Sequence, residues 1–148
     1  MVLAQIPNIS KKKVFVDSSV LMAAAISPKG SARDLINEAF TQKLEICISP
    51  DVLEETERNL KLKAPLGLDY FYKSVQSLTF KLTKPTKKQI LKAAKIVVGK
   101  DAPIVAGAIK AKVDYLVTYD RKHLLEYKRE IKTNFHLKVV TPDEVVNT

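Results

Sequence analysis

The sequence has one cysteine and no long apolar run in its 148 residues. A single cysteine, Cys47, excludes an internal disulfide and favours a reducing cellular interior. The longest unbroken apolar stretch, residues 20–26, is far too short to cross a membrane, because a spanning helix needs about 20 apolar residues. Residues 1–7 lack the basic start and long apolar middle of a secretory signal. We therefore expect a cytoplasmic protein without a membrane segment.

Repeats, low-complexity tracts and linker-like stretches are also absent from the sequence. Its hydrophobic content of 46% is enough to bury a sizeable core in a chain of this length. These features predict one compact domain over residues 1–148. The two histidines and the cysteine are not clustered, so the sequence does not favour a zinc site.

Positive charge dominates the composition. The chain has 25 Lys and Arg against 16 Asp and Glu, a formal net charge of +9. Such an excess favours polyanionic partners, because each phosphate that Lys or Arg neutralises releases condensed counterions. Lysine-rich surfaces also keep small proteins soluble, and composition alone does not separate the two interpretations.

Strand patterns alternate with helix patterns along the chain. Branched and aromatic runs without alternation, at residues 14–16, 44–49 and 115–118, are typical of strands covered on both faces of a parallel sheet. Helices are expected after Ser31, from Pro50 to about residue 62, over residues 68–80, from the Thr86 and Gln89 capping box to about residue 99, and after Asp101. A short basic helix and a last strand at residues 137–140 follow. The order predicts an α/β fold, a three-layer α/β/α sandwich with a central parallel sheet.

Acidic residues follow two of the predicted strands. Asp17 ends the first strand and Asp120 follows a later one. Because the carboxyl ends of parallel strands form the rim of the ligand crevice, we expect these side chains to meet. Asp101 at a helix start and Glu54 or Glu55 near another helix start can point to the same rim. Crowded carboxylates are costly unless a cation joins them, so the pattern predicts a divalent-metal site.

Each acid taken alone also has an ordinary explanation. Asp101 would serve as a helix cap, and Glu54 and Glu55 would complement the positive end of a helix dipole. Asp17 is different, because it stands between Val16 and an apolar run that begins three residues later, at Val20. A functional role is the simplest reason for a carboxylate in that position.

Four segments together carry a family resemblance. They are VFVDSSVL at residues 14–21, SPDVLEE at 49–55, KDAPIVA at 100–106 and DYLVTYDRKHL at 114–124. In this order they resemble the motifs of the PIN domain family, which comprises metal-dependent ribonucleases and includes the toxins of many prokaryotic toxin and antitoxin pairs. The resemblance covers essentially the whole chain and implies the PIN-like fold.

Site residues follow from the resemblance, motif by motif. It assigns catalysis and metal binding to four acids, Asp17, Glu55, Asp101 and Asp120, with a one-residue offset to Glu54 left open. It gives Ser18 and Thr118 supporting roles as hydroxyls that hold a metal-bound water or a carboxylate. His123 is expected to pack or cap, because the family chemistry does not require a histidine. The departure from the family pattern is Tyr119, where glycine is common.

The implied chemistry is hydrolysis of RNA. Hard carboxylate oxygens select Mg²⁺ or Mn²⁺, which would activate a water for attack on a phosphodiester. The resemblance implies cleavage of single-stranded or looped RNA to a 5′-phosphate and a 3′-hydroxyl, an antitoxin partner and a homodimer. Candidate phosphate contacts are Lys12, Lys13, Arg33, Arg121 and Lys122.

Two other functions are alternatives for this sequence. A phosphatase with an Asp nucleophile would carry a second Asp two residues after Asp17, where this chain has Ser19. A non-catalytic PIN-like module that binds RNA or protein remains the alternative. Retention of all four acids argues against it, since a site without catalysis has no physical reason to keep mutually repelling carboxylates.

Overall fold

A parallel sheet forms the centre of the molecule. The computed structural model describes residues 11–77 and 80–146, and its sheet has the strand order β3-β2-β1-β4-β5. The strands are β1 (Lys12–Val16), β2 (Leu44–Ile48), β3 (Lys81–Leu82), β4 (Tyr115–Val117) and β5 (Lys138–Val140), and every neighbouring pair is parallel. The predicted α/β fold with a central parallel sheet is confirmed.

The connection order reverses between β1 and β4. The chain leaves β1 towards β2 and β3 on one side of the sheet and later returns to β4 and β5 on the other side. Val14, Phe15 and Val16 are fully buried and pair in register with Tyr115, Leu116 and Val117. In open parallel sheets, such a reversal of strand order opens a ligand crevice at the carboxyl ends of the strands. Asp17 and Thr118 follow directly at that place.

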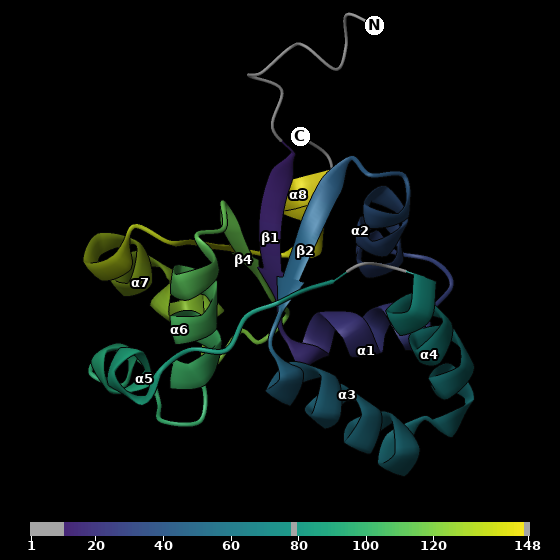
Figure 1. Ribbon diagram of the computed structural model, residues 1–148, viewed down its shortest axis with the longest axis horizontal. Helices are drawn as coiled ribbons and strands as arrows, with labels where there is room; N and C mark the ends of the chain where they lie inside the picture. Colours follow the sequence, from purple (N-terminus) through teal and green to yellow (C-terminus); the bar gives the residue numbers. More distant parts are fainter. Residues whose placement is uncertain (1–10, 78–79, 147–148) are drawn as a thin grey trace, which may run out of the picture.

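Helices cover the sheet on both sides. They are α1 (Ser18–Ile26), α2 (Ser31–Phe40), α3 (Pro50–Lys63), α4 (Leu68–Ser77), α5 (Lys87–Ala93), α6 (Ala102–Ala111), α7 (Lys128–Phe135) and α8 (Pro142–Val146), with short 3₁₀ turns η2 (Pro65–Gly67) and η3 (Leu125–Tyr127). Figure 1 shows α5, α6 and α7 to one side of the strands and α1 to α4 to the other. This arrangement makes the three layers.

Local signals in the sequence account for several helix boundaries. Thr86 and Gln89 form the predicted capping box at the start of α5, although this helix ends at Ala93 rather than near residue 99. α2 begins at Ser31, but Gly30 occupies its N-cap position, with a φ of 112° that suits glycine. Among the described helices, none is long and apolar enough to be a candidate membrane span.

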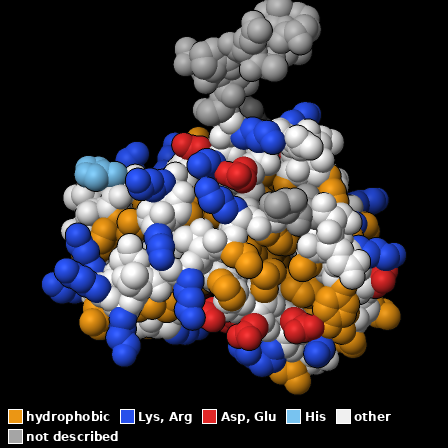
Figure 2. Space-filling view, in the orientation of Figure 1, with side chains coloured by type: hydrophobic (Ala, Val, Ile, Leu, Met, Phe, Trp, Pro, Cys, Tyr) orange, Lys and Arg blue, Asp and Glu red, His pale blue; other side chains and the backbone are white. Residues whose placement is uncertain are grey.

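Charge is unevenly distributed over the surface. Figure 2 shows Lys and Arg side chains spread over the side that carries α5 and α6, whereas acidic side chains gather where α3 runs. The surface around α3, the helix that contains Glu55, is therefore less positive than the surface around α5 and α6.

Close packing of α6 on β1 depends on Gly107. A Cβ added there would lie 2.9 Å from Cζ of the fully buried Phe15 ring. Although alanine is the better helix former by about 1 kcal/mol, we expect Gly107→Ala to destabilise the protein by about 1–2 kcal/mol, because overpacking outweighs that gain. Denaturant unfolding would measure it. Gly99→Ala is the control, since its Cβ would meet nothing within 4 Å. Equal stability of Gly107→Ala and the native chain would contradict this packing argument.

Candidate metal centre

Asp17 is held at the crevice by a complete set of hydrogen bonds. It is the N-cap of α1, and its Oδ1 accepts from the backbone N of Ser19 at 3.1 Å and from that of Val20 at 3.4 Å. The Ser19 hydroxyl also donates to Oδ1, and the Thr118 hydroxyl donates to Oδ2. The carboxylate, 6% exposed, is thereby fixed between the ends of β1 and β4.

The ionised form of Asp17 is disfavoured in spite of these donors. Burial raises the pKa of its carboxyl from 3.8 to about 6, the bonds from Ser19 and Thr118 oppose the rise, and the charge of Asp120 adds to it. A cation beside Asp17 would remove this penalty, because an opposite charge favours the ionised form.

Asp101 is a buried acid with an unpaired oxygen. It stands at the N-cap position of α6, but its side chain makes no capping hydrogen bond. It is 7% exposed, and Oδ2 has no hydrogen-bond partner among the described residues. Burial raises the pKa of Asp101, the charges of Asp120 and Glu55 raise it further, and those of His123 and Lys100 oppose the rise. The capping explanation therefore does not account for this side chain.

Thr118 joins Asp120 to Asp17. Its Oγ1 donates to Asp17 and accepts from the backbone N of Asp120 at 2.9 Å. Asp120 Oδ1 accepts from the backbone N of His123 at 3.0 Å, and Oδ2 lies 3.4 Å from His123 Nδ1. One ligand atom each from Asp101, Asp120 and His123 lie within 4.8 Å of one another.

Glu55 reaches the same rim from α3. The Ser18 hydroxyl, next to Asp17, donates to Glu55 Oε1 at 2.7 Å. Glu55 reaches the rim because α3 begins directly after β2 ends. Ser49 caps this helix by accepting from Val52 N at 3.2 Å. Glu54 is exposed on the same helix, so Glu55 is the glutamate that the fold brings to the other acids.

Together these residues fit a divalent cation. The acid cluster, defined as Asp17, Glu55, Asp101 and Asp120, consists of hard carboxylate oxygens that suit Mg²⁺ or Mn²⁺. An unpaired buried oxygen on Asp101 is costly unless a cation or a donor approaches it. Burial, and to a smaller extent the neighbouring negative charges, raise the pKa values of Asp17 and Asp101, and a bound cation would relieve this cost of ionisation.

The raised pKa of Asp17 predicts a pH dependence of stability. In the unfolded chain Asp17 ionises near pH 4, whereas in the folded metal-free chain it ionises near pH 6. The unfolded state therefore binds fewer protons between these values, and the metal-free protein loses stability as pH rises from about 4 to 6. The two-unit shift corresponds to a loss on the order of 3 kcal/mol. Denaturant unfolding in EDTA at pH 4.5 and 7 checks this, with Asp17→Asn as the control that lacks this contribution. An equal pH dependence in both proteins would contradict the assignment.

Comparison with known proteins identifies the family. A family model described as PIN domain matches residues 13–122. The chain belongs to the PIN domain family. The crystal structure of PAE2754 from Pyrobaculum aerophilum is 20% identical, with a TM-score of 0.64 over 92% of this chain and 88% of that one. That of Mycobacterium tuberculosis VapC20, named as a sarcin-ricin loop cleaving toxin, is 16% identical, with a TM-score of 0.53 over 74% and 91%.

These structural likenesses confirm the PIN-like fold that the sequence motifs implied. The two identities are low, so they establish the fold and no more. No curated protein is matched by sequence.

The candidate phosphate-contact residues do not all lie near the acid cluster. Arg121 and Lys122 are exposed directly after Asp120. Lys12 and Lys13 begin β1 and so lie at the opposite end of that strand from Asp17.

Three of these cations already have contacts within the protein. Lys13 Nζ is 3.9 Å from Glu45, and Lys12 Nζ is 5.7 Å from the centre of the Tyr115 ring. Arg33 donates from Nε to the backbone oxygen of Ala24 at 2.7 Å, and its guanidinium stacks 3.5 Å from the centre of the Tyr70 ring. A phosphate contact by these three stays a prediction.

Two polar residues at the site were not among the predicted ones. Ser19 Oγ donates to Asp17 and accepts from the backbone N of Tyr119 at 3.0 Å, so it ties α1 to the loop after β4. His123 faces both Asp101 and Asp120. The signals for them were their spacings, two residues after Asp17 and three residues after Asp120.

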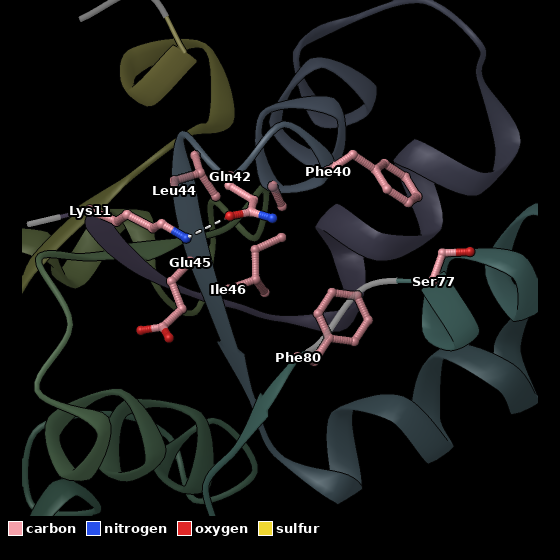
Figure 3. A pocket seen from close by; sticks show the side chains of 9 residues that line it. Lys11, Phe40, Gln42, Leu44, Glu45, Ile46, Ser77 and Phe80 are labelled. Carbon is pink, nitrogen blue, oxygen red and sulfur yellow. Dashed lines mark hydrogen bonds between the residues drawn. The ribbon is translucent and has the colours of Figure 1, made fainter. Parts of the chain in front are cut away.

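A pocket of about 320 Å³ lies away from these residues. It opens beside the start of β2, and its lining includes Phe40, Leu44, Ile46 and Phe80 (Figure 3). Lys11 and Glu45 are the charged residues of its described lining, and Lys11 Nζ donates to Gln42 at 3.4 Å. This pocket lacks the group of acids that lies at the rim between β1 and β4.

Proposed function

We propose that this PIN domain protein is a metal-dependent endoribonuclease that cleaves single-stranded RNA with Mg²⁺ or Mn²⁺. The observation that supports the proposal is the grouping of Asp101 and Asp120, whose ligand atoms lie within 4.8 Å of one another, with Asp101 Oδ2 buried and without a hydrogen-bond partner among the described residues. Glu55 lies near enough for its charge to act on Asp101, and Asp17 is coupled in the same way to Asp120. A structural role would have given Asp101 Oδ2 a donor, because buried polar atoms in proteins are almost always paired.

In the proposed mechanism, the hydroxyl side chains of the protein hold the carboxylates in position. A divalent cation bound at the cluster would supply a water of lowered pKa and offset the charge that develops on the phosphate. Thr118 and Ser19 hold the Asp17 carboxylate, and Ser18 holds that of Glu55. Because these hydroxyls donate to carboxylates, we assign them to orientation rather than to nucleophilic attack. Hydrolysis by water is proposed to leave a 5′-phosphate and a 3′-hydroxyl.

RNA as the substrate is supported by a basic groove. A groove of about 250 Å³ between α7 and β5 is lined by Val139, Val140, Glu144 and four cations, Lys128, Arg129, Lys132 and Lys138. It begins beside the site, because the Val140 oxygen accepts from the backbone N of Thr118 at 3.0 Å. Its cations offer positive charge to a phosphate backbone, which would bind it with little sequence preference, although Lys138 Nζ, like that of Lys12, also lies 5.7 Å from the centre of the Tyr115 ring. Arg121 and Lys122, exposed directly after Asp120, are further candidates for phosphate contacts.

Cleavage with end-group analysis tests this function. The native chain is incubated with labelled single-stranded RNA in Mn²⁺, in Mg²⁺ and in EDTA. We expect cleavage only with a metal ion, fragments with 5′-phosphates, and binding that weakens steeply as salt increases. Tight, salt-sensitive RNA binding without cleavage in any metal would favour the non-catalytic binding module. Cleavage that persists in EDTA would contradict the metal mechanism.

A toxin role with an antitoxin partner extends the proposal. VapC20 is described as a toxin, and the likeness of fold supports the same role for this chain. Leu62 and Leu66, 75% and 98% exposed, offer apolar surface for a protein partner or a second copy, as a proposed homodimer requires. Growth arrest on induced expression, relieved by Asp17→Asn, is the expected result. Normal growth of cells that accumulate the native protein would contradict the toxin role.

A further inference from the structure

His123 faces two members of the acid cluster, Asp101 and Asp120. Its Nδ1 lies 3.4 Å from Asp120 Oδ2 and 3.9 Å from Asp101 Oδ2. The His123 side chain is 29% exposed, so part of it contacts solvent while Nδ1 lies beside the two acids. Its backbone N donates to Asp120 Oδ1 at 3.0 Å, which holds the residue in place by a contact that does not use the ring.

The unpaired oxygen of Asp101 points to a ligand at this position. Asp101 is 7% exposed, and its Oδ2 has no hydrogen-bond partner among the described residues although it is one of the atoms next to His123 Nδ1. The three donor atoms lie within 4.8 Å of one another, which is a spacing that one cation can bridge. Two carboxylate oxygens and an imidazole nitrogen therefore surround one point.

We infer that His123 supplies an imidazole nitrogen to the cation that Asp101 and Asp120 hold. The inference rests on the metal site of the proposed function and adds a ligand to it. Mg²⁺ prefers oxygen ligands in near-ideal octahedral geometry, whereas imidazole suits transition-metal ions. His123 thus makes the site discriminate between Mn²⁺ and Mg²⁺ more strongly than the acids alone.

Pulsed electron paramagnetic resonance of bound Mn²⁺ tests the ligand directly. The chain has two histidines, and the other one, His136, is exposed at the end of α7. We expect a directly coordinated imidazole nitrogen in the native chain and in His136→Asn, and its loss in His123→Asn. Asparagine suits both variants, because it tolerates the left-handed backbone of His136 and keeps the backbone N–H of residue 123.

Metal affinities measured by titration give the second readout. We expect His123→Asn to weaken Mn²⁺ binding by about tenfold or more, as for other changes at metal sites, and Mg²⁺ binding by clearly less. Equal weakening of both ions, or Mn²⁺ bound without a coordinated nitrogen, would overturn the inference and leave the proposed function standing. A native chain that binds no Mn²⁺ would overturn both.

Discussion

Asp17→Asn is expected to abolish metal-dependent RNA cleavage while the fold stays intact. Asp17 is the acid with the most donors at the crevice, and losing its charge removes several kcal/mol of stabilisation from the transition state. About 4 kcal/mol corresponds to about a thousandfold lower rate. The measurement is the cleavage rate of a single-stranded RNA with Mn²⁺ at saturation.

The hydrogen bonds explain why this variant keeps its fold. Asparagine retains an oxygen that accepts from the backbone N of Ser19 and Val20, and its amide can donate to Thr118. Removing a buried charge also relieves repulsion with Asp120, so metal-free stability stays level or rises. Asp17→Ala separates the two roles, since it also loses the helix cap at a cost of about 1 kcal/mol. Unfolding of the asparagine variant, or full activity with Mn²⁺, would defeat this account of Asp17.

Glu55→Gln is expected to reduce cleavage by at least about a hundredfold, while Glu54→Gln leaves it unchanged. The two residues are adjacent on α3 and share their chemistry, but only Glu55 accepts from Ser18, and Glu54 is exposed. Replacing a cation ligand by a neutral amide removes charge at the metal without changing side-chain shape, and a loss of about 3 kcal/mol gives this factor.

Comparing the cleavage rates of the two variants, once both are shown to be equally stable, decides which glutamate acts at the site. Circular dichroism melting confirms that both variants fold, because neither glutamate lies in the apolar core. If Glu54→Gln lost activity and Glu55→Gln kept it, the metal-site glutamate would be one residue earlier than the structure indicates. Equal activity of both variants would remove α3 from the site.

The strand patterns of the sequence predicted most of the fold. Both faces of β1, β2 and β4 are buried, so each of these strands is an unbroken apolar run. Core residues such as Val14, Phe15 and Leu116 could therefore be recognised from the sequence. α1 was not predicted, because its residues VLMAAAI are apolar on every side and show no helical period. β3 has two residues, both exposed, and offers no pattern to detect.

Two of the predicted site residues are positioned by strand ends. Asp17 and Asp120 could be placed together because parallel strands end at one edge. The hydroxyl contacts of Ser18 and Thr118 required the family resemblance for their prediction. Their partners, Glu55 and Asp17, are visible only in three dimensions.

Closeness in sequence does not by itself place a basic residue beside Asp17. Lys12 and Lys13 are five and four positions from Asp17, but a strand is extended by about 3.3 Å per residue, so they lie at the far end of β1, and a phosphate contact by them stays a prediction. The groove proposed for RNA is lined by Lys128, Arg129, Lys132 and Lys138. They come from α7 and β5, which no spacing rule relates to Asp17.

We propose that Asp17, Glu55, Asp101 and Asp120 form one metal site, and thermal unfolding with Mn²⁺ is the decisive experiment. At neutral pH the native chain is melted in EDTA and in Mn²⁺, beside a variant with both Asp17→Asn and Asp120→Asn. A cation that binds only the folded cluster stabilises it by about 2.7 kcal/mol at a hundredfold excess over Kd. We predict a clear rise of the native midpoint and none in the double variant. An unchanged native midpoint at millimolar Mn²⁺, or an equal rise in both proteins, would contradict the claim.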